Sequence, residues 1–128
     1  MKFHVIEVDQ NMVYGNTLFG ELRGKWKYDT PIVNTSYEIE LDINCVFIYK
    51  KNIFRADICS TSISCEGDHV CIFGVLESRD DDGYAVLRMN DSIIVFDLDS
   101  CELQVGDVVK LYMDFKDIDM SPVPFASY

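Results

Sequence analysis

Hydrophobic and polar residues alternate along most of this chain, most clearly in residues 36–44. Successive side chains of a β-strand point to opposite faces, so a period of two predicts a strand with one buried face and one exposed face. The expected buried face consists of Tyr37, Ile39, Leu41 and Ile43, and the expected exposed face consists of Glu38, Glu40 and Asp42. This segment is therefore predicted to place a row of carboxylates on the protein surface.

Three further strands are expected between residues 69 and 98. Turn-forming residues at 80–83 and at 90–91 divide this stretch into apolar runs. Asp, Asn and Gly tolerate the positive φ angles that tight hairpin turns require. The pattern predicts an antiparallel meander of three strands, and another strand over 108–115 after the turn at 105–107.

The remaining segments give weaker signals. Residues 10–29 contain three glycines and no helical periodicity, so any helix there should be short. Residues 50–68 are compatible with one more strand or with an irregular excursion. The segment 120–125 carries Pro122 and Pro124, and proline cannot donate a hydrogen bond to a neighbouring strand. We therefore expect this segment at a sheet edge or in a loop.

The spacing of turns indicates the fold class. Turn residues recur about every 8 to 12 positions, which is typical of an all-β sandwich or a small barrel. The 128 residues match the usual size of one domain, and no repeat or linker divides them. We predict a single β-rich domain over residues 1–128, a small antiparallel β-barrel or sandwich with at most one or two short helices.

The net charge of −11 arises from three stretches of the chain. Residues 37–44 contribute −3, residues 77–82 contribute −3 and residues 97–119 contribute −5, whereas the intervening segments balance. Concentrated like charge repels phosphate backbones and attracts oppositely charged surfaces. We therefore expect a basic protein partner and no nucleic-acid partner.

The cysteines and the N-terminal residues bear on location and on metal binding. The N-terminus lacks the apolar core of a signal peptide, and no apolar run is long enough to cross a bilayer. We expect a cytoplasmic protein without membrane contact and with reduced thiols. Cys59, Cys65, His69 and Cys71 are the candidate zinc ligands, but five residues separate successive cysteines, against two to four in typical structural sites. Neither a metal nor another cofactor is expected.

Two other functions are considered from the residues. Neither His4 nor His69 lies in a recognisable catalytic signature, so the chain is not expected to be an enzyme. Residues 23–28 interleave basic and aromatic side chains, as nucleic-acid surfaces do. The strongly negative net charge opposes contact with a polyanion. A nucleic-acid or ligand-binding module that uses this segment is the alternative to an inhibitor.

A resemblance adds to this interpretation. The meander from residue 70, the segment Val105-Gly-Asp-Val-Val-Lys-Leu111 and the following Pro122 resemble a small OB-type or related β-barrel. The acidic strand over 37–42 that precedes them is similar to what is expected in small bacterial immunity proteins of contact-dependent inhibition and related polymorphic-toxin systems. The resemblance spans about half the chain. It implies a cytosolic protein that neutralises a cognate toxin domain, frequently a nuclease, by covering it.

The leading hypothesis is a non-enzymatic inhibitor that binds a basic toxin domain, most often a nuclease, through an acidic patch rimmed by aromatic residues. Nucleases need cationic clefts for phosphates, and an acidic surface can occupy such a cleft. Tyr84 and Tyr112 are predicted to point outward and to act as aromatic anchors. The acidic residues expected to bind the partner are Glu38, Glu40, Asp42, Asp80, Asp81, Asp82, Asp97 and Asp99.

Overall fold

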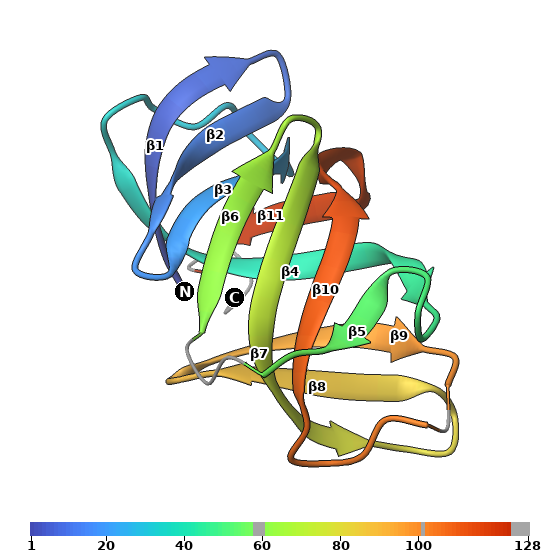
Figure 1. The fold of residues 1–128 in the computed structure, drawn as a ribbon. Helices are drawn as coiled ribbons and strands as arrows, with labels where there is room; N and C mark the ends of the chain where they lie inside the picture. Colours follow the sequence, from blue (N-terminus) through green and yellow to red (C-terminus); the bar gives the residue numbers. More distant parts are fainter. Residues whose placement is uncertain (58–60, 101, 124–128) are drawn as a thin grey trace.

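The computed structural model describes residues 1–57, 61–100 and 102–123, which form one sheet of 11 strands (Figure 1). The strands are β1 (Lys2–Asp9), β2 (Met12–Thr17), β3 (Gly20–Trp26), β4 (Ser36–Phe47), β5 (Ile53–Arg55), β6 (Ser62–Glu66), β7 (His69–Arg79), β8 (Tyr84–Met89), β9 (Ser92–Leu98), β10 (Val108–Asp114) and β11 (Ile118–Pro122). A short 3₁₀ helix, η1 (Phe115–Asp117), joins β10 to β11. Strands account for 66% of the residues, which confirms the predicted mainly-β class.

The sheet closes on itself as an eight-stranded barrel, which is one of the two architectures expected from the sequence. A ring of pairings runs from β1 through β2, β3, β6, β7, β8, β9 and β4 and returns to β1. Strand β11 bridges β3 and β4, and β10 and β5 extend the sheet from β7. Strands β1, β2 and β3 lie at one end of the molecule, and β8 and β9 lie at the other (Figure 1).

The predicted alternation of β4 is confirmed. Ile39, Leu41 and Ile43 are buried in the core, whereas the acidic residues between them are exposed. Tyr37 is half-buried, and its ring meets that of Trp26 edge to face with 5.1 Å between the ring centroids. Period two therefore fixes which side of this strand faces water.

The predicted meander is also confirmed, as β7, β8 and β9 pair in sequence as antiparallel neighbours. Its first turn contains Gly83 with a φ of 94°, a backbone conformation that L side chains rarely adopt. Gly106 has a φ of 97° in the turn before β10. Strand β10 then alternates as expected, with Val109, Leu111 and Met113 buried.

The segments with weak signals form strands. Residues 10–29, for which the sequence allowed a short helix, contain β2 and β3, and residues 50–68 contain β5 and β6. The glycines of the first segment allow close strand contact. A Cβ atom on Gly15 would lie 2.1 Å from the carbonyl oxygen of His4, and one on Gly24 would lie 2.9 Å from that of Ile118. These glycines are therefore explained by interstrand contact.

The prediction that the proline-containing tail lies at an edge or in a loop is wrong for its described part. Strand β11 lies between β3 and β4 and ends at Pro122, which stands opposite Ile39. Ile39 exchanges its backbone hydrogen bonds with Met1 on the other side of β4, so its polar groups point away from β11. An antiparallel pair of this kind needs no N–H from Pro122. Pro124 lies outside the described residues.

Several pairings depart from the expected antiparallel arrangement. Strand β4 runs parallel to β9, and β3 runs parallel to both β11 and β6. The register of β4 against β9 shifts between Asp42 and Val46, where β4 advances further than its partner. Such a bulge bends the strand locally.

None of the helices in the described part of the chain is long and apolar enough to span a membrane.

Candidate functional site

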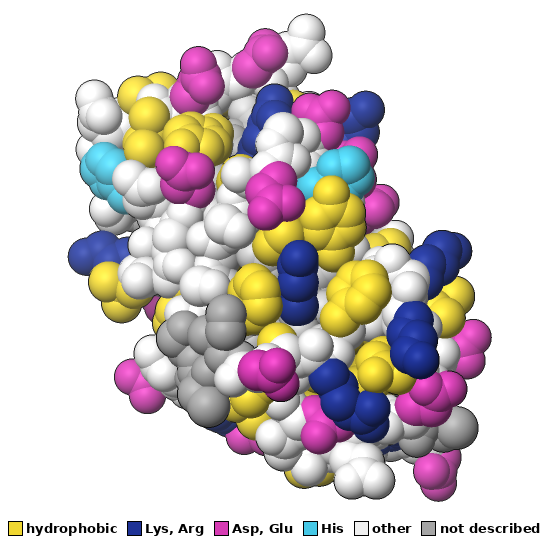
Figure 2. Space-filling view, in the orientation of Figure 1, with side chains coloured by type: hydrophobic (Ala, Val, Ile, Leu, Met, Phe, Trp, Pro, Cys, Tyr) yellow, Lys and Arg dark blue, Asp and Glu magenta, His cyan; other side chains and the backbone are white. Residues whose placement is uncertain are grey.

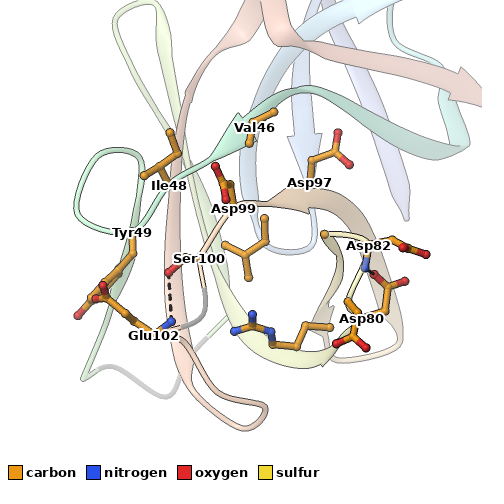
Figure 3. Close-up of a pocket in the computed structure, with 13 residues that line it drawn as sticks. Val46, Ile48, Tyr49, Asp80, Asp82, Asp97, Asp99, Ser100 and Glu102 are labelled. Atoms are coloured by element: carbon orange, nitrogen blue, oxygen red, sulfur yellow. Dashed lines mark hydrogen bonds between the residues drawn. The ribbon is translucent and has the colours of Figure 1, made fainter.

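An acidic groove of about 820 Å³ lies where the turn between β7 and β8 meets the ends of β4 and β9 (Figure 3). Aliphatic side chains of Val46 and Ile48 and the ring of Tyr49 line one wall. The acidic residues that line the groove are Asp80, Asp81, Asp82, Asp97, Asp99 and Glu102. Two of the three acidic stretches of the sequence thus meet in one hollow.

Backbone hydrogen bonds hold the walls of the groove in place. The Oδ1 atom of Asp80 accepts the N–H groups of Asp82 and Tyr84, both at 2.9 Å, and so closes the turn. Leu98 donates its N–H to the carbonyl of Gly83 at 2.7 Å, which joins this turn to the end of β9. Asp80 therefore shapes the groove, while its neighbours project their carboxylates into solvent.

The negative charge of the groove has little local compensation. Arg79 is the cationic residue in its lining, and its Nη1 atom donates to the carbonyl oxygen of Leu103 at 2.6 Å. Within residues 1–57, 61–100 and 102–123, the groove carboxylates form no ion pair. The carboxylates consequently sum to a local negative potential over the opening.

The remaining acidic stretch, residues 37–44, reaches the same side of the barrel through Asp42 of β4. Asp42 stands opposite Val95 of β9, and Asp97, two residues further along β9, stands opposite Val46 of β4 and Tyr84 of β8. All these side chains share the outer face because directly opposed residues of neighbouring strands point to the same side. We call this the β4–β9–β8 face. It carries Asp42, Asp97 and Tyr84, with Asp80, Asp81, Asp82 and Asp99 at its groove end.

The other predicted partner-binding residues lie elsewhere. Glu38 forms an ion pair of 3.1 Å with the amino group of Met1, and Lys2 stands opposite it. Glu40 stands opposite Ser121 of β11, further from the groove along β4. Tyr112 lies on β10, which pairs with β7 and β5 and not with the strands of the β4–β9–β8 face. The structure therefore gathers seven of the ten predicted positions and separates these three.

Sequence reasoning missed the exposed aliphatic residues of the β4–β9–β8 face. Ile93 and Val95 on β9 and Val46 and Ile48 at the end of β4 are exposed. In the sequence, the run Ile93-Ile94-Val95 indicates only an apolar strand. The alternation within β9 could have identified these residues. Ile94 and Phe96 point into the core, so Ile93 and Val95 point outward.

The thiols do not form a site in the described structure. No cluster of three or more candidate metal ligands occurs in the part of the chain that the structure describes, and Cys59 lies outside that part. Burial raises the pKa of Cys65 and of Cys71, and raises that of Cys45 to about 11. A raised pKa lowers the fraction of thiolate, which is the form that attacks substrates and binds metals.

Three residues of the basic segment 23–28, all on β3, are engaged within the molecule, whereas Lys27 and Tyr28 are exposed. Arg23 lies 3.5 Å from Asp68 and stacks over the ring of Phe115 at 4.1 Å. Lys25 lies 3.6 Å from Asp119. Trp26 is buried in the core, so its ring is not available for stacking with a ligand.

Comparison of this chain with protein-family models, with curated proteins and with solved structures found no match.

Proposed function

We propose that this chain is a non-enzymatic acidic inhibitor, an immunity protein that binds and neutralises a basic cognate toxin domain, and that this domain is a nuclease. The observation that supports it is that carboxylates from all three acidic stretches lie on the β4–β9–β8 face and its groove, with Asp42 as the contribution of the first stretch. Acid that merely keeps a protein in solution has no need to gather at one end of a barrel.

Electrostatics explains how such a surface would act. A nuclease binds phosphates in a cationic cleft, and a carboxylate-rich surface with little local counter-charge is complementary to that cleft. Long-range attraction raises the association rate, and occupation of the cleft excludes the nucleic acid. The inhibitor needs no chemistry of its own for this effect.

The positions of the histidines agree with a binding role. His4 contacts the hydroxyl of Ser36 at 3.0 Å, and His69 stacks on Tyr112. Both lie outside the groove lining. The groove itself offers carboxylates and aliphatic side chains, which suit recognition of a cationic surface.

The test is protection of growth. The product of the gene immediately upstream, tested as the candidate toxin, is expressed with the wild-type chain, with an Asp81/Asp82/Asp99→Asn variant, or with a control that carries Asp9, Asp29 and Asp57→Asn. Both variants lose three negative charges, but only the first loses them from the groove. We expect wild type and control to protect and the groove variant to fail. Equal protection by both variants, or no protection by wild type, would contradict the proposal.

A further inference from the structure

Four exposed apolar side chains lie near one another on the β4–β9–β8 face, at the edge of the acidic groove. We call Val46, Tyr84, Ile93 and Val95 the apolar strip. Their exposed fractions are 51%, 56%, 53% and 45%, respectively. These values are high for large apolar side chains, which are usually found inside a domain.

The strand register places these four residues close together. Val95 lies at its centre, with Ile93 two residues away on the same strand and Val86 of β8 directly opposite. Tyr84 and Val46 both stand opposite Asp97, so each is a diagonal neighbour of Val95. Opposed side chains on antiparallel strands lie about 4.5–5.5 Å apart and diagonal ones about 7–8 Å apart, which places Tyr84 within reach of Val95. One partner surface can therefore contact all four residues together.

Carboxylates border the strip on several sides. Asp42 lies opposite Val95, Asp97 lies between Tyr84 and Val46, and the groove carboxylates continue beyond them. Arg88 stands opposite Ile93, but its guanidinium makes two hydrogen bonds with Glu77, at 2.7 and 2.9 Å. Arg88 is thus already paired with Glu77, and Asp42 and Asp97 form no ion pair within the part of the chain that the structure describes.

The charge and the apolar side chains of this surface indicate which class of partner it binds. A contiguous exposed apolar patch rimmed by polar residues is typical of a protein-binding site. A second copy of the chain would bring its own carboxylates against these and would carry the same net charge of −11. Charge complementarity instead favours a partner whose apolar side chains are flanked by lysine or arginine.

We propose that the apolar strip is the centre of an interface with a cationic protein surface that presents aliphatic side chains between basic ones. This inference rests on the proposed function and names the chemistry of the partner at the same site. The carboxylates accelerate encounter, and the strip slows dissociation because its burial removes apolar surface from water. Ile93 and Val95, both on the middle strand of this face, are therefore the residues to substitute.

The test uses two synthetic peptides of equal charge as probes. In one peptide lysines flank leucines, and in the other serines replace the leucines. Both are titrated into the isotope-labelled chain at low salt, and amide shifts give the binding site and affinity. We expect the leucine peptide to bind about tenfold more tightly and to shift the amides of Ile93 and Val95. The serine peptide should shift only the groove.

Two variants complete the experiment. Ile93→Ser with Val95→Ser should remove the preference for the leucine peptide and leave the affinity for the serine peptide unchanged. Val95→Thr, which keeps the shape of the side chain, should reduce the preference in part without altering the fold. Melting curves check that each variant is folded.

The outcomes separate this inference from the function on which it rests. Equal affinity of the wild-type chain for both peptides would overturn the strip and leave the acidic site intact. No binding of either peptide would contradict the proposed function itself. A wild-type dimer in sedimentation that Ile93→Ser dissociates would assign the strip to a second copy and would also overturn the inference.

Discussion

Two outer faces of the sheet follow the same strand alternation but expose different chemistry. On the face of β7, β10 and β5, apolar side chains are partly covered and cationic side chains gather over β10 and β5 (Figure 2). On the β4–β9–β8 face, apolar side chains stand uncovered among carboxylates. Neighbouring side chains cover part of the apolar surface of the first face, whereas the apolar side chains of the second face are exposed.

On the face of β7, β10 and β5, a lysine side chain lies over aromatic rings. The Nζ atom of Lys110 lies 5.8 Å from the ring centre of Phe73 and 5.7 Å from that of Tyr112. The rings of Tyr112 and His69 stack with 4.7 Å between their centroids. The long stem of a lysine shields aromatic surface from water while its ammonium group stays solvated. Tyr112 therefore has an intramolecular role that the sequence did not indicate.

The largest expected effect separates the core from the apolar strip within one strand. Ile94 is 1% exposed and its neighbour Ile93 is 53% exposed. Ile94→Ala should lower the free energy of unfolding by about 2–5 kcal/mol, because it leaves a cavity in the core. Ile93→Ala should change it by at most about 0.5 kcal/mol. Urea denaturation measures both, and equal losses would show that the strip stabilises the fold.

A second expected effect separates the shape of the groove from its charge. Asp80→Ala should lower the free energy of unfolding by about 1–2 kcal/mol, because two backbone N–H groups lose their acceptor. Asp81→Ala removes the same charge without breaking a described hydrogen bond and should leave stability nearly unchanged. Thermal unfolding compares the two. Similar destabilisation by both would indicate that the turn depends on charge and not on the cap.

The sequence predicted the part of this comparison that depends on local pattern. Alternation placed Leu41 inside and Asp42 outside, and turn residues divided β7, β8 and β9 correctly. It did not predict β11, because the tolerance of Pro122 depends on the hydrogen bonds of Ile39 with Met1. Neither did it predict which acidic stretches meet, because the pairing of β4 with β9 joins residues far apart in the chain.

A smaller effect is expected from uncovering the shielded rings. Lys110→Ser should lower the free energy of unfolding by about 0.5–1 kcal/mol, because the lysine stem and ammonium group leave the rings of Phe73 and Tyr112. Val95→Thr on the open face has no such cover to lose and should change stability less. Denaturation curves measured in parallel check the difference. A larger loss for Val95→Thr would reverse the contrast between the two faces.

The smallest effect concerns a paired carboxylate outside the groove. The N–H of Gln104, at 2.8 Å, and the guanidinium of Arg55, at 3.2 Å, lower the pKa of Asp107. A lowered pKa in the folded state adds stability above the ordinary carboxyl pKa, and this stability is lost as the pH falls through the lowered value. Asp107→Asn should therefore destabilise slightly at neutral pH, and its difference from wild type should shrink in acid. A difference that grows in acid would contradict the assignment.

The most direct test of the central claim is the dependence of binding kinetics on salt. The candidate toxin, the product of the gene immediately upstream, is mixed with the wild-type chain or with the Asp81/Asp82/Asp99→Asn variant over a range of ionic strengths. The wild-type association rate should fall steeply as salt shortens the Debye length to about 8 Å at 0.15 M. The groove variant should associate more slowly at low salt and respond less to added salt. Association rates that are equal for the two proteins and indifferent to salt would contradict the account.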